Sequence, residues 1–168
     1  KSNTDTEVIL YLYIKFREKC LDYLEGMFAF AIYDNLKKEL FCARDQFGIK
    51  PFYYTNNKHE FFFSSELRSF FVNNKFKKKP NLRSVHRYLT SEYYEHLTET
   101  FYEGIFKLKP GYFLRVKDNK IIEKQFWNFS DELKKKTIPK KINDKEKYFY
   151  DLTNQSVKKS FISDVPIT

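Results

Sequence analysis

The sequence contains few of the residues that characterise disulfide-rich, fibrous or low-complexity chains. Its 168 residues include two cysteines, four glycines and five prolines. Two cysteines cannot form a disulfide framework, and no Cys-x-x-Cys pair is present to bind zinc. So little glycine and proline excludes collagen-like chains and flexible linkers. The cysteine content is typical of a reducing compartment, so we expect a cytoplasmic protein.

Long apolar runs are also missing from the sequence. No uninterrupted stretch approaches the roughly 20 apolar residues needed to cross a bilayer. The opening residues, KSNTD, do not resemble a signal peptide. We therefore expect no membrane association. The chain begins with Lys1 rather than Met, which indicates processing or truncation.

Aromatic residues and positive charge are abundant instead. Aromatic residues make up 20% of the chain, enough to exclude disorder as the default, and the formal net charge is +9. This charge leaves a nucleic-acid-binding module as an alternative hypothesis. Most of the basic residues are lysine, and no aromatic residues interleave with the two Lys-rich stretches in a groove-like pattern. Solvated loops are therefore the favoured interpretation, with nucleic acid not expected as a partner.

Hydrophobic periodicity predicts an α+β protein. A helical pattern follows Thr4, and strict alternation over 28–33 and a second run over 39–44 predict a strand hairpin with both faces covered. Further hairpins are predicted over 52–64 and 112–127, the first turning at residues 56 and 57. Short helices are expected over 65–71 and from residue 82.

The last part of the sequence reads as the start of a second domain. Residues 134–141 are basic and interrupted by proline, which is typical of a linker. A final helix follows, for which we predict that Phe149, Leu152, Val157 and Phe161 face inward. The expected domains are therefore residues 1–134 and residues 135–168.

The cysteines and histidines of the sequence show no pattern of a catalytic or metal site. Cys20 falls on the apolar face of a predicted helix and Cys42 inside a predicted strand, so we expect inert, buried thiols. His59, His86 and His96 lack metal-ligand spacing and are expected on the surface or in loops.

Arg44, Asp45 and Gly48 follow directly after the second strand of the first hairpin. An aspartate that caps a turn and a glycine with positive φ explain these residue types, so a structural role is favoured over a functional one.

Several blocks, in order, resemble glutamine-hydrolysing asparagine synthetases and related class II glutamine amidotransferases. They are TDTEVIL at 4–10, GMFAFAIYD at 26–34, ARDQFGIKPFYY at 43–54, Ser65-Glu66 followed by Leu67, and SDVP at 163–166. The resemblance covers essentially the whole chain, and the two longest blocks are very specific.

The resemblance implies a fold and a reaction. The fold would be part of an αββα N-terminal-nucleophile hydrolase sandwich, the glutaminase domain, followed by the first helix of an ATP-pyrophosphatase-type synthetase domain. In this family a cysteine at residue one attacks the glutamine amide, and ammonia passes to the second domain. There ATP, with Mg²⁺, activates the β-carboxylate of aspartate. The full enzyme would be a homodimer that uses glutamine, aspartate and ATP.

The sequence departs from that pattern at both ends. Residue one is Lys1 rather than cysteine, and the family's first third, with its Arg and Asn-Gly-Glu contacts, is absent. Thr168 stands where the family has glycine, before its Ser-Gly-Gly pyrophosphate loop. We therefore expect an internal fragment that is inactive alone, with no catalytic nucleophile, ATP-binding residue or metal ligand of its own.

Asp5 is the one candidate site residue. In the family, the Asp of this motif binds the α-amino group of glutamine, and a carboxylate is the natural partner of an ammonium group. Its position alone would favour a simpler role in complementing the helix dipole, and the neighbouring motif reverses that preference. Two further hypotheses stay open. One is an amidotransferase for another carboxylate, such as a sugar or peptide acid, and the second is a scaffold without chemistry.

Overall fold

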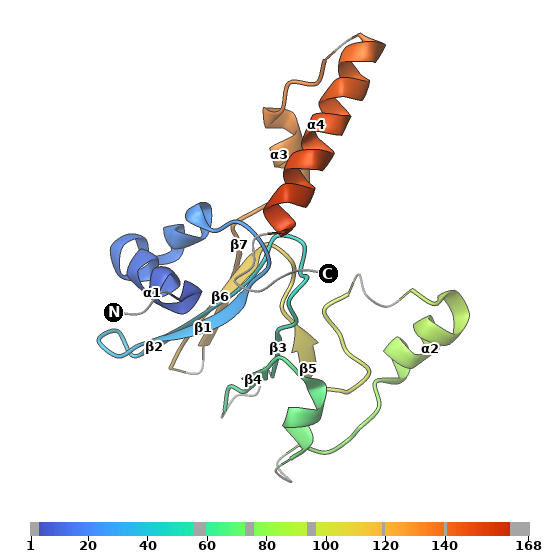
Figure 1. The fold of residues 1–168 in the computed structure, drawn as a ribbon. Coiled ribbons are helices and arrows are strands. Elements are labelled where there is room, and N and C mark those ends of the chain that lie inside the picture. Colours follow the sequence, from blue (N-terminus) through green and yellow to red (C-terminus); the bar gives the residue numbers. More distant parts are fainter. Residues whose placement is uncertain are drawn as a thin grey trace. The chain divides into compact units, whose positions relative to one another are not determined.

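A computed structural model describes residues 4–55, 60–72, 76–93, 97–118, 120–139 and 141–161. The chain divides into two compact units, Lys1–Asn128 and Phe129–Thr168. Within the described residues the structure is a mixed α/β fold with two antiparallel sheets (Figure 1). The domain boundary expected between residues 134 and 135 stays a prediction.

The first unit opens with helix α1 (Asp5–Phe16), which runs into the 3-10 helix η1 (Arg17–Tyr23). Thr4 precedes α1 in an extended conformation, and its carbonyl accepts hydrogen bonds from the backbone N–H groups of Glu7 and Val8. The chain bends at Arg17, where φ is +55°. The helix predicted after Thr4 is therefore confirmed.

A four-stranded sheet forms the centre of the first unit. Its order is β1-β2-β6-β7, and all of its neighbours are antiparallel. The strands are β1 (Ala29–Asp34), β2 (Glu39–Arg44), β6 (Tyr112–Lys117) and β7 (Lys120–Gln125). Both hairpins that build this sheet are confirmed, because alternating apolar residues around short polar turns specify them locally. Residue 119, in the second turn, lies outside the described residues.

A smaller sheet has the order β4-β3-β5. Its strands are β3 (Tyr53–Thr55), β4 (Phe63–Ser64) and β5 (Ile105–Lys107). The strand predicted over 60–64 is thus shorter than expected, and the turn predicted at residues 56 and 57 lies outside the described residues. The sequence pattern did not predict β5, which pairs with a strand about fifty residues away.

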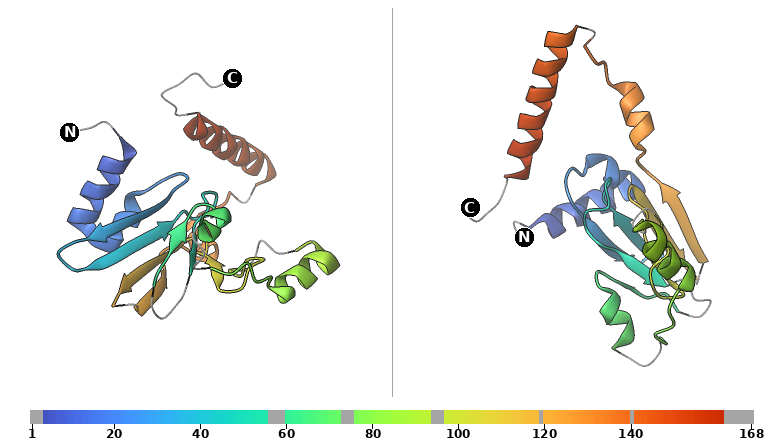
Figure 2. Two further views of the ribbon diagram at one scale, coloured as in Figure 1. Left: turned by 90° about the horizontal axis from the view of Figure 1, so that it is seen from below. Right: turned by 90° about the vertical axis from the view of Figure 1, so that its right-hand side faces the viewer.

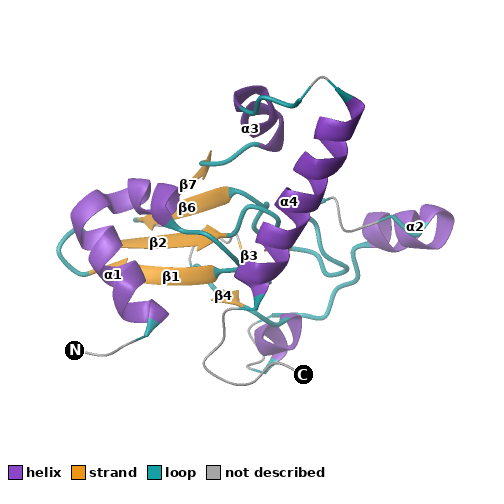
Figure 3. Ribbon diagram, turned by 45° about the horizontal axis from the view of Figure 1, so that its top comes forward, coloured by secondary structure: helices purple, strands orange, loops and turns teal. Residues whose placement is uncertain are grey.

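Two hydrophobic cores lie on opposite faces of the four-stranded sheet. The helix-side core holds Tyr13 of α1 and Leu21 of η1 against Phe41 and Phe113. The sheet-side core holds Leu114 and Val116 of the large sheet against side chains of the small sheet and its flanks, Phe52, Tyr54 and Leu108. Figure 3 shows α1 across the large sheet. The expectation that both faces of the first hairpin are covered is confirmed.

The layers follow from strict alternation in β1 and β2. Phe30 and Phe41 point into the helix-side core, whereas Ala31 and Cys42 point into the sheet-side core. Phe41 is 1% exposed and its ring lies 5.1 Å from that of Tyr13. The large aromatic side chains therefore pack against the helix layer on one face of the sheet. The small side chains of Ala31 and Cys42 on the other face let the second sheet approach closely.

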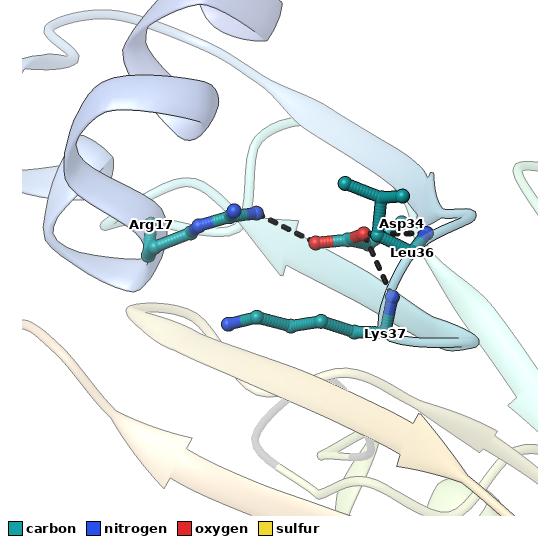
Figure 4. A network of polar contacts seen from close by, with 4 residues as sticks. All are labelled: Arg17, Asp34, Leu36 and Lys37. Atoms are coloured by element: carbon teal, nitrogen blue, oxygen red, sulfur yellow. Dashed lines mark hydrogen bonds and ion pairs between the residues drawn. The ribbon is translucent and has the colours of Figure 1, made fainter.

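An ion pair fixes the junction of α1 and η1 to the sheet. Arg17 donates to Asp34 Oδ2 at 2.6 Å, and Asp34 Oδ1 accepts from the backbone N–H groups of Leu36 and Lys37, each at 3.1 Å (Figure 4). The Lys37 N–H bond is the largest cause that lowers the pKa of Asp34; partial burial opposes it, and the Arg17 charge adds to it. Asp34 therefore ties three segments together in its ionised form.

The segment between β4 and β5 carries the 3-10 helix η2 (Leu67–Phe71) and helix α2 (Leu82–Ser91), as Figure 2 shows. Asn81 caps α2 by accepting a hydrogen bond from the Ser84 N–H. Arg87 pairs with Glu99 at 3.1 Å, which ties α2 to the returning chain. Both short helices were predicted from the sequence.

The second unit contains helix α3 (Phe129–Lys135) and helix α4 (Ile142–Ser160). The prediction that four apolar side chains of the last helix face inward is wrong for this chain. Their exposed fractions are Phe149 72%, Leu152 45%, Val157 47% and Phe161 60%. The described residues of this unit leave these side chains exposed, so the periodicity identifies an apolar helix face but not what covers it.

Candidate functional site

Asp5 lies at the first position of α1, where the sequence predicts a ligand contact. Backbone N–H groups in the first turn of a helix are not all used within the helix, and they favour a negative charge. The Asp5 residue is exposed and lies at the edge of a pocket of about 240 Å³. The residues that line this pocket are Asp5, Val8, Ile9, Leu24, Glu25, Met27 and Phe28.

Two carboxylates share this pocket with an apolar wall. Among the described residues that line it, Asp5 and Glu25 carry charge and none is lysine or arginine. A cation with a short aliphatic body fits such a lining, because carboxylates attract an ammonium group and the apolar side chains can contact the aliphatic part. The pocket is therefore suited to an amino group.

Glu25 is the member of this pocket that sequence reasoning missed. It comes from the segment after η1, and folding brings it to the beginning of α1. One feature of the sequence could have indicated it: Glu25 directly precedes the block at 26–34, in the segment that connects the helices to the first strand.

No nucleophile lies in this pocket among the described residues. Cys20 and Cys42 are both 0% exposed, one in the helix-side core and the other in the sheet-side core. Burial raises the pKa of Cys20 to about 11 and raises that of Cys42 further. A thiol attacks as its thiolate, and burial disfavours the thiolate at both positions. The prediction that both thiols are buried is confirmed, and their lack of reactivity stays a prediction.

Asp45 is a buried carboxylate that holds the turn after β2. It is 1% exposed. Its Oδ1 accepts from the backbone N–H groups of Phe47 at 3.1 Å and Ile49 at 3.0 Å, and its Oδ2 accepts from that of Lys50 at 3.0 Å. The Asp45 carbonyl also accepts from the Gly111 N–H at 2.9 Å, which fixes the entry to β6. The turn-capping role predicted for Asp45 is confirmed.

Arg44 and Gly48 complete this turn. The Arg44 guanidinium donates to the carbonyl oxygens of Gly48, Lys50 and Leu108, the last two at 2.7 Å. Gly48 has φ of +66°, and a Cβ atom there would lie 2.8 Å from Pro110 Cγ. The structural interpretation of both residues is confirmed. Gln46 donates to the Leu24 carbonyl at 3.2 Å, which connects this turn to the wall of the Asp5 pocket.

A second pocket of about 340 Å³ lies against the same turn and is lined in part by Arg44, Lys107 and Lys109. The basic groups there already have partners. Arg44 donates to three carbonyls, and Lys109 Nζ lies 3.4 Å from Glu123 Oε2. The Asp5 pocket is the better candidate for an amino-group ligand, because among the described residues that line it Asp5 and Glu25 are acidic and none is basic.

The described residues contain neither a candidate metal-ion cluster nor a candidate membrane-spanning helix. No group of three or more His, Cys, Asp or Glu side chains there could hold a metal ion. His86 is exposed on α2, whereas His59 and His96 lie outside the described residues. In the part of the chain that the structure describes, no helix is both long and apolar enough to span a bilayer.

Comparison with known proteins identifies the family. The family described as a glutamine amidotransferase domain matches residues 1–127. This chain belongs to that family. The amidotransferase match ends at residue 127, two residues before the second structural unit begins at Phe129, so α3 and α4 lie outside it.

Curated relatives of this amidotransferase domain are longer proteins. The chain is 29% identical over 164 residues to asparagine synthetase [glutamine-hydrolyzing] 3 of Bacillus subtilis, covering 98% of this chain and 26% of that protein. It is 34% identical over 171 residues to putative asparagine synthetase [glutamine-hydrolyzing] 2 of Methanocaldococcus jannaschii, covering 99% and 32%. It is also 31% identical over 127 residues to amidase chry2 of Gibberella zeae, covering 75% and 18%. The chain thus spans a third or less of each relative.

Proposed function

We propose that this chain is the glutamine-recognising part of a glutamine-hydrolysing asparagine synthetase. The observation that carries the proposal is Asp5, which lies at the beginning of α1 in a pocket that holds a second carboxylate. The amidotransferase family and the names of the relatives support the proposal.

The role of Asp5 in this proposal is to bind the α-amino group of glutamine. Its carboxylate accepts hydrogen bonds from the ammonium group, and Glu25 adds negative potential on the same pocket wall. The apolar lining, which includes Val8 and Met27, offers a surface for the aliphatic part of glutamine. The α-carboxylate of glutamine requires a cation, which we assign to residues outside this chain.

The nucleophile of the reaction also comes from elsewhere in this proposal. Cys20 and Cys42 are too deeply buried to attack glutamine. We assign the attack to a cysteine outside these 168 residues, as the resemblance implies. The observed layers, α1 on the large sheet and the large sheet on the small one, support assignment to part of an αββα N-terminal-nucleophile sandwich.

The ATP-dependent step is assigned to a further domain. The described residues offer no cluster of three or more His, Cys, Asp or Glu side chains for Mg²⁺, and we derive no ATP chemistry from them. We assign α4 to the beginning of an ATP-pyrophosphatase-type domain, and its exposed apolar side chains support that assignment because they require a cover. A cytoplasmic homodimer remains the expectation for the full enzyme.

The acceptor of the ammonia is aspartate in this proposal. A second candidate is another carboxylate, since relatives named amidase also match this chain. Synthesis assays of the longer protein with aspartate and with other carboxylic acids distinguish the two. Glutamine-dependent product with aspartate alone supports the first.

The test of glutamine recognition is Asp5→Asn in the longer protein that carries this chain. Removal of one charged partner from the ammonium group should raise the KM for glutamine by about 30-fold, the equivalent of roughly 2 kcal/mol. Synthesis from free ammonia should continue, because it bypasses the pocket.

Asp22→Asn is the matched control. Asp22 is an exposed aspartate on η1 outside the pocket, and the same chemical change there should leave the KM for glutamine unchanged. An unchanged KM in Asp5→Asn would contradict the proposal, as would an equal effect of both substitutions.

A further inference from the structure

Residues 24–28 form one wall of the Asp5 pocket. Four of these five residues line it, namely Leu24, Glu25, Met27 and Phe28. In the described structure, η1 ends at Tyr23 and β1 begins at Ala29, so no helix or strand contains this wall. The wall therefore lacks the regular hydrogen-bond pattern of a helix or sheet, and its shape depends on contacts from elsewhere in the fold.

The turn after β2 contacts both ends of this wall. The side-chain Nε2 of Gln46 donates a hydrogen bond to the Leu24 carbonyl at 3.2 Å. The backbone N–H of Asp45 donates to the Phe28 carbonyl at 2.8 Å. Two neighbouring residues of the turn thus hold a five-residue segment by its first and its last residue.

The turn that supplies these two donors is itself held firmly. The Asp45 carboxylate accepts hydrogen bonds from three backbone N–H groups of the turn, and the Arg44 guanidinium donates to three carbonyl oxygens. Gln46 is half-buried and extends from this fixed backbone. A donor on such a support is already in place before a ligand arrives, which is what a binding site needs from the residues behind it.

Gly26 lies between the two held ends. Its φ is +103°, and nothing lies within 4 Å of a Cβ atom built on it. A glycine in open space allows the backbone on either side of it to turn, so the neighbouring residue keeps its place only if it is held from its other side. For the exposed Glu25, that other side is Leu24, whose carbonyl accepts from Gln46.

We infer that Gln46 is a positioning residue of the Asp5 pocket, which through its hydrogen bond to Leu24 holds the Glu25 carboxylate where it attracts the amino group of the ligand. This inference rests on the proposed function, in which that amino group belongs to glutamine. Gln46 acts through Leu24 and Glu25 and does not contact the ligand. The other anchor, the Asp45 N–H, is a backbone group, so Gln46 is the anchor that a side-chain substitution can remove.

Gln46→Met in the longer protein tests this role, because methionine keeps the length of the unbranched side chain and removes the donor. Loss of one hydrogen bond between uncharged groups should raise the KM for glutamine by about fivefold. The kcat should stay unchanged, because the amino group is bound equally in the ground state and in the transition state. Gln125→Met is the matched control, at the exposed end of β7 and outside the pocket, and should leave the KM unchanged.

A double-variant cycle with Glu25→Ala separates positioning from a merely structural role. Once the Glu25 side chain is absent, its place no longer matters, so adding Gln46→Met to Glu25→Ala should raise the KM no further. If Gln46 only stabilised the fold, Gln46→Met would lower the melting temperature and reduce synthesis from glutamine and from free ammonia alike. It would do so with and without the Glu25 side chain.

Asp5→Asn in the same series distinguishes the two ways to fail. A KM raised by Asp5→Asn but unchanged by Gln46→Met would overturn the role of Gln46 and leave the glutamine site intact. The same fold-increase from Gln46→Met in the natural protein and in Glu25→Ala would also overturn it, because Gln46 would then act independently of Glu25. An unchanged KM in Asp5→Asn would contradict the proposed function, and the role of Gln46 would fall with it.

Discussion

Asp5 and Asp45 are both aspartates at the end of a secondary-structure element, and the fold treats them differently. Asp45 is 1% exposed and accepts hydrogen bonds from three backbone N–H groups. Asp5 is exposed at the mouth of a pocket that it shares with Glu25. A carboxylate whose donors all come from its own loop stabilises the fold, whereas one that faces a pocket is available to a ligand.

The largest effect on stability is expected at Asp45. Asp45→Asn replaces one acceptor oxygen with a donor against backbone N–H groups, so buried hydrogen bonds are lost. We expect the free energy of unfolding to fall by about 2–4 kcal/mol in urea denaturation. Asp5→Asn is the control and should change it by less than about 0.5 kcal/mol. Similar losses for both would erase the contrast between the two aspartates.

Gly48→Ala should cost somewhat less, about 1–3 kcal/mol, because a Cβ atom there meets Pro110 Cγ at 2.8 Å. Gly104→Ala is the matched control. Its φ of +77° is close to that of Gly48, but nothing lies within 4 Å of the added Cβ. The difference in stability loss between Gly48→Ala and Gly104→Ala, measured by thermal unfolding, gives the cost of the steric clash alone. Equal destabilisation would show that the packing of the turn is unimportant.

These two substitutions also mark where sequence reasoning succeeded. The turn chemistry of Asp45 and Gly48 is local, since a capping carboxylate and a positive φ follow from residue type. The hairpins β1–β2 and β6–β7 are local for the same reason. Such features are encoded within about ten residues and need no knowledge of the rest of the chain.

What depends on distant segments could not be predicted. Strand β5 has three residues, and its partner β3 lies about fifty positions earlier. Glu25 reaches the Asp5 pocket only because η1 folds back beside α1. In α4 the sequence predicted a buried face that the structure leaves exposed. Periodicity identifies an apolar face of a helix but not the segment that covers it.

Acid should remove the contribution of Asp34 to stability. The Lys37 N–H and the Arg17 charge lower its pKa below the ordinary value of 3.8, so its contribution is present above that value and is lost as the pH falls through the lowered pKa. The unfolding free energies of the natural chain and of Asp34→Asn should differ near pH 6 and converge near pH 2, in a urea series at several pH values. A constant difference would contradict the ionic role of Asp34.

The two cysteine thiols are expected to show no reaction at all in the folded chain. Cys20, with a pKa of about 11, and Cys42 should not react with a thiol reagent at about pH 8 while the chain is folded, and both should react after denaturation. The 168-residue chain should release no ammonia from glutamine. Ammonia release that disappears in Cys20→Ser or Cys42→Ser would refute the assignment of the nucleophile to a residue outside this chain.

The contrast between the two aspartates can be tested in one experiment on the longer protein. The KM for glutamine and the free energy of unfolding are measured side by side for the natural protein and for Asp5→Asn. We predict a KM raised by about 30-fold with stability unchanged to within about 0.5 kcal/mol. An unchanged KM, or a loss of stability as large as that of Asp45→Asn, would show that Asp5 supports the fold and does not bind glutamine.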